Sequence, residues 1–241
     1  MMIFRMTVFA GVTGLLMACG GPVEPAESVS IERDSGSVLW SGLPPRSHDH
    51  VNRRLDEIEA LPVMQAGALF IGDSITEAAP LSTMFPNVQT ANHGIAWDTT
   101  DGVLLRMNQI TRHRPERIFL MIGTNDTDHS SDPARVSENT IRITDAIIAA
   151  LPDTELYVVS VLPRNEPNNS VVSTFNQTVR EAAADRPYVY LDLARSMRAP
   201  NGELRPELTN DNLHLNADGY NVWAIVLADC VRNGCPEGLS Q

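Results

Sequence analysis

Along most of the chain, continuous runs of apolar residues alternate with segments in which apolar residues recur at helical spacing. Four runs predict buried strands, at residues 68–71, 118–122, 156–162 and 188–193, and a less apolar fifth strand is expected at residues 88–92. Apolar residues three and four positions apart predict helices over residues 51–58, 98–110, 133–151, 172–183 and 217–231. Strands and helices therefore alternate from residue 51 to residue 231.

The predicted helices carry start and stop signals. Pro62 and Pro152 should end the first and third helices, because proline cannot continue the backbone hydrogen bonds of a helix. Asp132 and Pro133 form an N-cap and first-turn pair, and Asn216 should cap the last helix.

This alternation predicts one fold class. Strands that are apolar on both faces form parallel sheets covered by helices. Five such strands predict an α/β fold of the flavodoxin-like type, a three-layer α/β/α sandwich with a five-stranded parallel sheet. Ligands of these sheets bind beyond the carboxyl ends of the strands, so the chemistry should lie there.

Composition limits the size and the function. The chain has 241 residues, of which 43% are hydrophobic, enough for one α/β domain with short appendages. All 18 basic residues are arginine, so there is no lysine for a Walker A phosphate loop or for a Schiff base. The net charge of −12 argues against a nucleic-acid-binding surface.

The N-terminus has the features of an export signal. Residues 1–18 hold Arg5 and then an uncharged run, as in a signal peptide, and the run is too short to span a bilayer. It ends in Leu16-Met17-Ala18-Cys19, which resembles a bacterial lipobox and implies lipidation of Cys19. An ordinary secretory signal and a short buried helix are the alternatives. The Gly-, Pro- and Ser-rich residues 19–40 predict a flexible tether, and residues 41–241 form the domain.

These features predict a location in the cell envelope. The absence of aspartate after Cys19 resembles sorting signals for the outer membrane, where the protein would face the periplasm on a lipid anchor; otherwise it would be secreted or periplasmic. Cys230 and Cys235 then remain as a pair, which favours a disulfide in an oxidising compartment over two free thiols.

Polar residues gather where the predicted strands end. The first block is Gly72-Asp73-Ser74-Ile75-Thr76, after the first strand, and three more follow in chain order: residues 92–99, 123–126 and 211–216. Each block alone has an ordinary structural interpretation: Ser74 as a helix N-cap, Asn125 as a turn residue, His214 as a surface histidine. Together, at one edge of one sheet, they predict a catalytic site.

The four blocks resemble those of the SGNH hydrolases, the GDSL-type esterases and lipases, and residues 99–107 resemble the platelet-activating-factor acetylhydrolase-like branch. The resemblance implies Ser74 as the nucleophile, His214 as the general base, Asp211 as the carboxylate that orients it and Asn125 as an oxyanion donor. Asp211 and His214 lie three residues apart, so one turn can join the carboxylate to the imidazole. Asp73 is expected to cap a helix or to brace the loop, and not to act in catalysis.

One position departs from the family pattern. Many members have a glycine before the Asp-Thr of the second block, and its backbone N–H binds the oxyanion together with that of the nucleophile; here the residue is Trp97. Every residue except proline carries this N–H. We therefore expect the hole to consist of the Ser74 and Trp97 N–H groups and Asn125, with Gly94 as a shaping residue or substitute donor.

The sequence thus predicts an exported serine esterase that hydrolyses short acyl esters, such as acetyl esters, through an acyl-enzyme, without metal or cofactor. The alternatives are a longer-chain lipase, lysophospholipase or thioesterase, and a non-catalytic envelope lipoprotein on the same fold. The expected partners are a small acyl-ester substrate and, through the anchor, a membrane, but no nucleic acid. His48 and His50 lack further metal ligands and are expected to be a solvated helix start. The oligomeric state is left open.

Overall fold

A parallel sheet forms the centre of the molecule. The computed structural model describes residues 45–128 and 132–235 of the chain. The strands are β1 (Ala68–Gly72), β2 (Thr90–Gly94), β3 (Arg117–Met121), β4 (Glu155–Val159) and β5 (Val189–Leu191). Neighbouring strands pair in parallel in the order β2-β1-β3-β4-β5. The predicted five-stranded parallel sheet and α/β class are confirmed.

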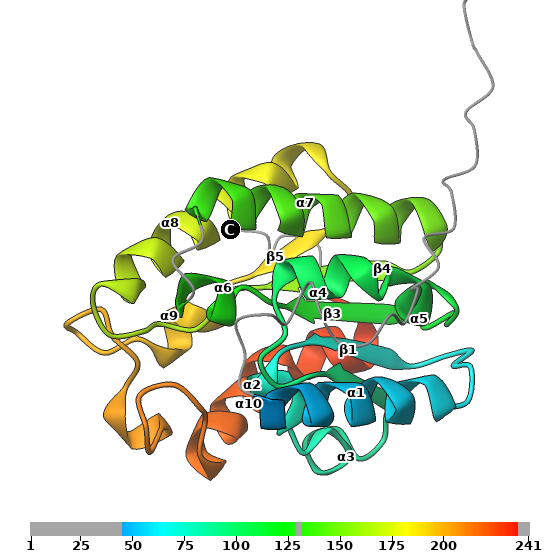
Figure 1. Cartoon of the computed structure of the whole chain (residues 1–241), viewed down its shortest axis with the longest axis horizontal. Helices are drawn as coiled ribbons and strands as arrows, with labels where there is room; N and C mark the ends of the chain where they lie inside the picture. Colours follow the sequence, from blue (N-terminus) through cyan, green and yellow to red (C-terminus); the bar gives the residue numbers. More distant parts are fainter. Residues whose placement is uncertain (1–44, 129–131, 236–241) are drawn as a thin grey trace, which may run out of the picture.

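Helices cover both faces of the sheet. They are α1 (Pro45–Ala60), α2 (Ser74–Glu77), α3 (Leu81–Met84), α4 (Thr100–Leu105), α5 (Met107–Thr111), α6 (Thr124–Asp128), α7 (Pro133–Ala150), α8 (Asn168–Ala182), α9 (Leu193–Met197) and α10 (Ala217–Asn233), with short 3-10 turns η1 (Ala183–Asp185) and η2 (Pro206–Leu208). Figure 1 shows α7 and α8 on one side of the strands and α10 with α3 on the other.

Alternate strand residues pack into two cores. Phe70, Phe119 and Tyr157 lie in one row across β1, β3 and β4, with successive ring centroids 4.9 and 4.8 Å apart. This row packs with the apolar residues of α10. The intervening residues, such as Leu69 and Ile118, pack toward α7 and α8. Because side chains alternate along a strand, each strand supplies both layers of the sandwich.

The predicted caps form as expected. The Asp132 carboxylate accepts the Ala134 N–H at 3.0 Å, and the Asn216 side chain accepts the Gly219 N–H at 3.0 Å. The expected helix over residues 98–110 was wrong in one respect: it is divided into α4 and α5 at Arg106. Arg106 leaves the helical conformation, with φ −104° and ψ 21°, and its guanidinium binds Asp98 and the His93 carbonyl.

The predicted signal peptide (1–18), the lipidation site Cys19 and the tether (19–40) lie outside the described residues. Within the described ranges, no helix is both long and apolar enough to cross a membrane. At the other end of the domain, Cys230 and Cys235 are joined by a disulfide.

Candidate active site

Ser74 lies directly beyond the carboxyl end of β1. It is the first residue of α2, and Asp73, not Ser74, is the N-cap: the Asp73 carboxylate accepts the Ile75 N–H at 2.9 Å. The capping role predicted for Asp73 is confirmed. The Ser74 side chain is therefore free for a contact outside its own helix, and its N–H lies in the first turn, where helix amides have no acceptor within the helix.

A tight loop before α10 holds Asp211 and His214. Thr209 and Leu215 pair in an antiparallel bridge, and the Asn216 N–H donates to the Leu208 carbonyl at 2.9 Å. These contacts close the loop at its base. Asn212, between the two, has a positive φ of 62°, a conformation that asparagine tolerates better than most residues.

The structure brings Ser74, His214 and Asp211 into one chain of hydrogen bonds. The Ser74 Oγ lies 3.0 Å from His214 Nε2, although the two residues are 140 positions apart. On the other side of the ring, His214 Nδ1 lies 2.7 Å from Asp211 Oδ2. This geometry lets a neutral imidazole take the serine proton while the carboxylate fixes the ring.

Asp211 stays ionised in this arrangement. Partial desolvation raises its pKa, but the hydrogen bonds from the His214 ring and from the backbone N–H groups of His214 and Leu213 outweigh desolvation and lower the pKa to about 2. These N–H groups lie 2.7 and 3.0 Å from Asp211 Oδ1. The Asp211 and His214 side chains are 52% and 44% exposed, so an ester can reach the site from solvent.

A buried tyrosine connects the two halves of this chain. The Tyr220 hydroxyl on α10 donates to the Ile75 carbonyl on α2 at 2.8 Å. The contact ties the helix that follows His214 to the helix that begins at Ser74. The sequence pattern does not indicate this contact, because Tyr220 occupies one of the apolar positions that predict the last helix.

The expected oxyanion hole includes two backbone N–H groups. Across residues 45–128 and 132–235, no acceptor reaches the N–H of Ser74 or of Trp97. Gly94 differs, because its N–H donates to Asn92 Oδ1 at 2.8 Å. The expectation that Gly94 could serve as a substitute oxyanion donor was therefore wrong. It shapes the loop: a Cβ on Gly94 would clash with the Glu77 backbone nitrogen.

Asn125 belongs to the third block and is nearly buried. Its Nδ2 donates to the Asp98 carbonyl at 2.8 Å, which fixes the orientation of the amide. An amide nitrogen carries two hydrogens, so one remains for a ligand. The next residue, Asp126, accepts both the N–H and the hydroxyl of Thr100, which joins the third block to the start of α4.

A buried ion pair supports the loop that follows β2. Asp98 Oδ2 lies 2.9 Å from Arg106 Nε and 2.8 Å from Arg106 Nη2, and both side chains are almost fully buried. Burial raises the pKa of Asp98 to about 6, and the Arg106 charge opposes this shift. Sequence reasoning missed the pair. The available signal was a single arginine among the apolar residues Val103, Leu104 and Met107.

The predicted solvated histidines make contacts that the sequence did not indicate. His50 on α1 lies 2.9 Å from the Glu77 carboxylate, so it is not simply a solvated residue. His93 is fully buried against His113, with 4.9 Å between ring centroids. Burial lowers the pKa of His93. In the described ranges, no cluster of three or more His, Cys, Asp or Glu residues could hold a metal ion.

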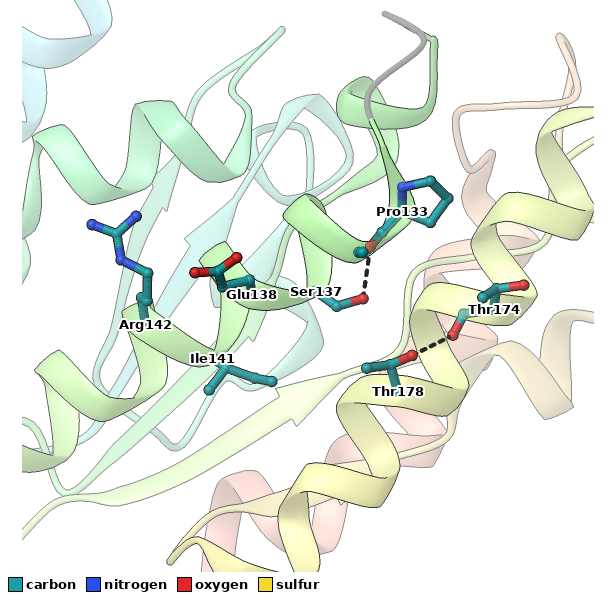
Figure 2. Close-up of a pocket in the computed structure, with 8 residues that line it drawn as sticks. Pro133, Ser137, Glu138, Ile141, Arg142, Thr174 and Thr178 are labelled. Carbon is teal, nitrogen blue, oxygen red and sulfur yellow. Dashed lines mark hydrogen bonds between the residues drawn. The ribbon is translucent and has the colours of Figure 1, made fainter.

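A groove of about 390 Å³ lies elsewhere, between α7 and α8. Figure 2 shows Ile141 and Arg142 on one helix and Thr174 and Thr178 on the other. None of the residues of the hydrogen-bonded chain lines it. The groove is therefore separate from the site at Ser74.

Comparisons with known proteins agree with the site. The sequence model of the GDSL-like lipase/acylhydrolase family matches residues 70–222, which include all four polar blocks. No curated protein matched the chain significantly.

Solved structures share the fold. One from Streptococcus pneumonia, named after platelet activating factor, is 27% identical, with a TM-score of 0.68. The match covers 76% of this chain and 93% of that chain. A GDSL-like lipase from Bacteroides thetaiotaomicron is 19% identical, with a TM-score of 0.66, over 77% of this chain and 98% of its own. An acetylxylan esterase from Geobacillus stearothermophilus is 16% identical, with a TM-score of 0.59, over 71% of this chain and 96% of that chain.

Proposed function

Because the chain belongs to the GDSL-like lipase/acylhydrolase family and is an ester hydrolase, we propose that it cleaves short-chain acyl esters, acetyl esters included, through an acyl-enzyme on Ser74. The observation that carries this proposal is the chain of hydrogen bonds from Ser74 Oγ to His214 and from His214 to Asp211, at 3.0 and 2.7 Å.

In the first half-reaction, Ser74 Oγ attacks the ester carbonyl while His214 Nε2 takes the hydroxyl proton. The negative charge on the carbonyl oxygen is stabilised by the N–H groups of Ser74 and Trp97 and by the free N–H of Asn125. The C–O bond to the alcohol then breaks, and His214 returns the proton to the departing alkoxide. The alcohol leaves, and the acyl group remains on Ser74.

In the second half-reaction, water attacks the acyl carbonyl and His214 takes a proton from it. The bond to Ser74 Oγ breaks, the proton returns to this oxygen, and the acid is released. Asp211 remains a carboxylate throughout, which agrees with its pKa of about 2, and keeps the ring in the tautomer that accepts at Nε2.

The acetylxylan esterase that shares this fold supports a short acyl group, because its name gives acetyl esters as its substrates. The groove between α7 and α8 could hold a long chain by volume, but no residue of the catalytic chain lines it.

Covalent labelling tests the nucleophile. A fluorophosphonate should label the wild-type protein at Ser74 and fail to label Ser74→Ala, whereas Ser82→Ala, which changes an exposed serine on the neighbouring α3, should label normally. A folded wild-type protein that does not label would favour the non-catalytic lipoprotein.

A series of p-nitrophenyl esters from acetate to palmitate tests the acyl length. We expect kcat/KM to be highest for acetate and butyrate. A maximum at palmitate would contradict the short-chain proposal and favour a lipase. Acetyl release from xylan or peptidoglycan fragments would identify a sugar ester as the substrate.

Export and lipid anchoring at Cys19 belong to the same proposal. The lipobox-like sequence supports them, and so does the Cys230–Cys235 disulfide, because disulfides persist in oxidising compartments. Expression in a bacterium with labelled palmitate should place the label in the protein and not in Cys19→Ser. Equal labelling of both, or of neither, would contradict the anchor.

A further inference from the structure

Trp97 is an exposed aromatic side chain at the carboxyl edge of the sheet. Its exposed fraction is 40%. Among the described residues, the other exposed large hydrophobic side chains are Val63, which precedes β1, and Ile225 on α10. Trp97 therefore differs from them in following the end of β2, beside the catalytic serine.

The backbone of Trp97 is held in a conformation that tryptophan disfavours. Its φ is 66°, in the left-handed region where a bulky side chain is rare. The neighbours on both sides are fixed: the Ala96 N–H donates to Glu77 Oε2 at 2.6 Å, and Asp98 is held by Arg106. The backbone on both sides of Trp97 is therefore fixed.

The same contacts place Trp97 close to Ser74. Glu77 belongs to α2, the helix that Ser74 begins, and the Ile95 N–H donates to the Gly72 carbonyl at 3.0 Å. His50 contacts the indole edge-on, with 5.4 Å between ring centroids, and is itself held by Glu77. The indole is thus supported on the protein side and open on the side of solvent.

We propose that the exposed indole of Trp97 binds the alcohol half of the ester and selects alcohols that carry an uncharged ring. This inference rests on the proposed function, because a short acyl group leaves only the alcohol to reach an exposed side chain at the rim. A flat aromatic surface packs best against another flat apolar surface. The net charge of −12 disfavours anionic substrates.

The test compares benzyl acetate with ethyl acetate, which share the acyl group and differ in the ring. Trp97→Phe and Trp97→Leu form a matched pair, since both keep the backbone N–H and a bulky residue at positive φ, and only phenylalanine keeps a ring. We expect the ratio of kcat/KM for benzyl over ethyl acetate to stay near the wild-type ratio in Trp97→Phe. It should fall by about 3- to 10-fold in Trp97→Leu and Trp97→Gly.

A charged analogue tests the second half of the proposal. Wild-type enzyme should cleave 4-carboxybenzyl acetate with a lower kcat/KM than benzyl acetate, and added NaCl should narrow the difference. Ile225→Ala, which removes an exposed apolar side chain from α10, should leave the benzyl-to-ethyl ratio and the carboxybenzyl-to-benzyl ratio unchanged. An unchanged benzyl-to-ethyl ratio in Trp97→Leu, or an equal loss in Trp97→Phe, would overturn the proposal.

Binding separates this inference from the proposed function. Benzyl acetate should quench the tryptophan fluorescence of Ser74→Ala and should quench that of Ser74→Ala/Trp97→Phe much less. If the wild-type enzyme cleaves neither ester in a Ser74-dependent way, the proposed function fails, and this binding assay still decides whether Trp97 holds the ring. Equal quenching in both proteins would contradict the role of Trp97.

Discussion

At the scale of single residues, two carboxylates near Ser74 have different pKa values, because burial raises the pKa of a carboxylate and hydrogen bonds to its charged form lower it. Asp211 is exposed and accepts several hydrogen bonds, which lower its pKa to about 2. Asp73 is fully buried, and burial raises its pKa to about 7. Asp211 is therefore suited to carry a negative charge beside the His214 imidazole, whereas Asp73 favours its neutral form.

The pKa of Asp73 predicts a pH-dependent stability. A folded-state pKa of about 7, above the reference value of 3.8, means that its contribution to the free energy of unfolding is complete below pH 3.8 and is lost as the pH rises to about 7. Asp73→Asn lacks this titration but keeps an oxygen that can accept the Ile75 N–H. The variant should therefore gain stability relative to the wild type between pH 4 and pH 7.

Urea unfolding of both proteins at several pH values measures this difference. Ionisations elsewhere are common to the two proteins and cancel. The stability difference should increase with pH over this range and then level off. A difference that is constant from pH 4 to pH 8 would show that Asp73 has no raised pKa.

Asn125 gives the second prediction at this scale. Loss of one oxyanion donor typically costs about 2.7–4 kcal/mol of transition-state stabilisation. Asn125→Ala should therefore lower kcat for p-nitrophenyl acetate by about 100- to 1000-fold, with a small change in KM. Asn176→Ala is the matched control, because Asn176 is also a buried asparagine and binds both the N–H and the carbonyl of Val161.

The control should lose stability and keep its kcat. If both asparagine variants lose the same fraction of kcat in proportion to their loss of stability, Asn125 is a structural residue and not an oxyanion donor.

At the scale of elements, the break between α4 and α5 organises the loops beyond the carboxyl ends of β2 and β3. Arg106 ends one helix and precedes the next, and this turn directs its guanidinium inward to Asp98 and to the His93 carbonyl. The Asp98 carbonyl in turn orients the Asn125 amide. A single interruption of a helix thus connects the second and third blocks.

The Asp98–Arg106 pair can be tested by removing one charge or both. Arg106→Met leaves a buried carboxylate without its partner and should lower the free energy of unfolding by about 3–5 kcal/mol. Asp98→Asn/Arg106→Met removes both charges and should recover most of this loss. Chemical denaturation of the three proteins measures it, and a double variant no more stable than the single one would contradict a compensating pair.

At the scale of the whole molecule, α10 connects the Asp211–His214 loop with α2 and with the Cys230–Cys235 disulfide. The Asp211–His214 loop precedes it, Tyr220 ties it to α2, and Cys230 near its end bonds to Cys235. The Cys235 N–H also donates to the Tyr157 hydroxyl on β4 at 3.0 Å. The disulfide and this hydrogen bond therefore fix Cys235 against β4.

The disulfide should matter for stability and little for catalysis. The Cys230–Cys235 bond closes a loop with a sequence separation of only 5, and a loop this short constrains the unfolded chain by about 2 kcal/mol. Cys230→Ser/Cys235→Ser should lower the unfolding midpoint modestly and keep kcat/KM. A reductant should give the same shift in the wild type and none in the variant. Loss of activity in a folded variant would contradict this separation.

The sequence by itself determined the sheet, the helix caps and the positions of the four polar blocks. Apolar runs, proline stops and Asp or Asn caps act within a few residues, so local physical chemistry is enough to place Asp132 and Asn216 at helix starts. The resemblance of the blocks to a known family indicated Ser74, His214 and Asp211, which the structure brings together.

Only the tertiary structure decided how the blocks are held. The Gly94 N–H is not available to an oxyanion, because it donates to the Asn92 side chain. Arg106, Glu77 and Tyr220 each hold part of the site through partners that are distant in sequence or buried. These are contacts of individual polar atoms, and their partners depend on which groups folding places within about 3 Å of each other. A pattern of polar and apolar positions specifies which side of an element is buried, but it does not specify which buried donor meets which acceptor.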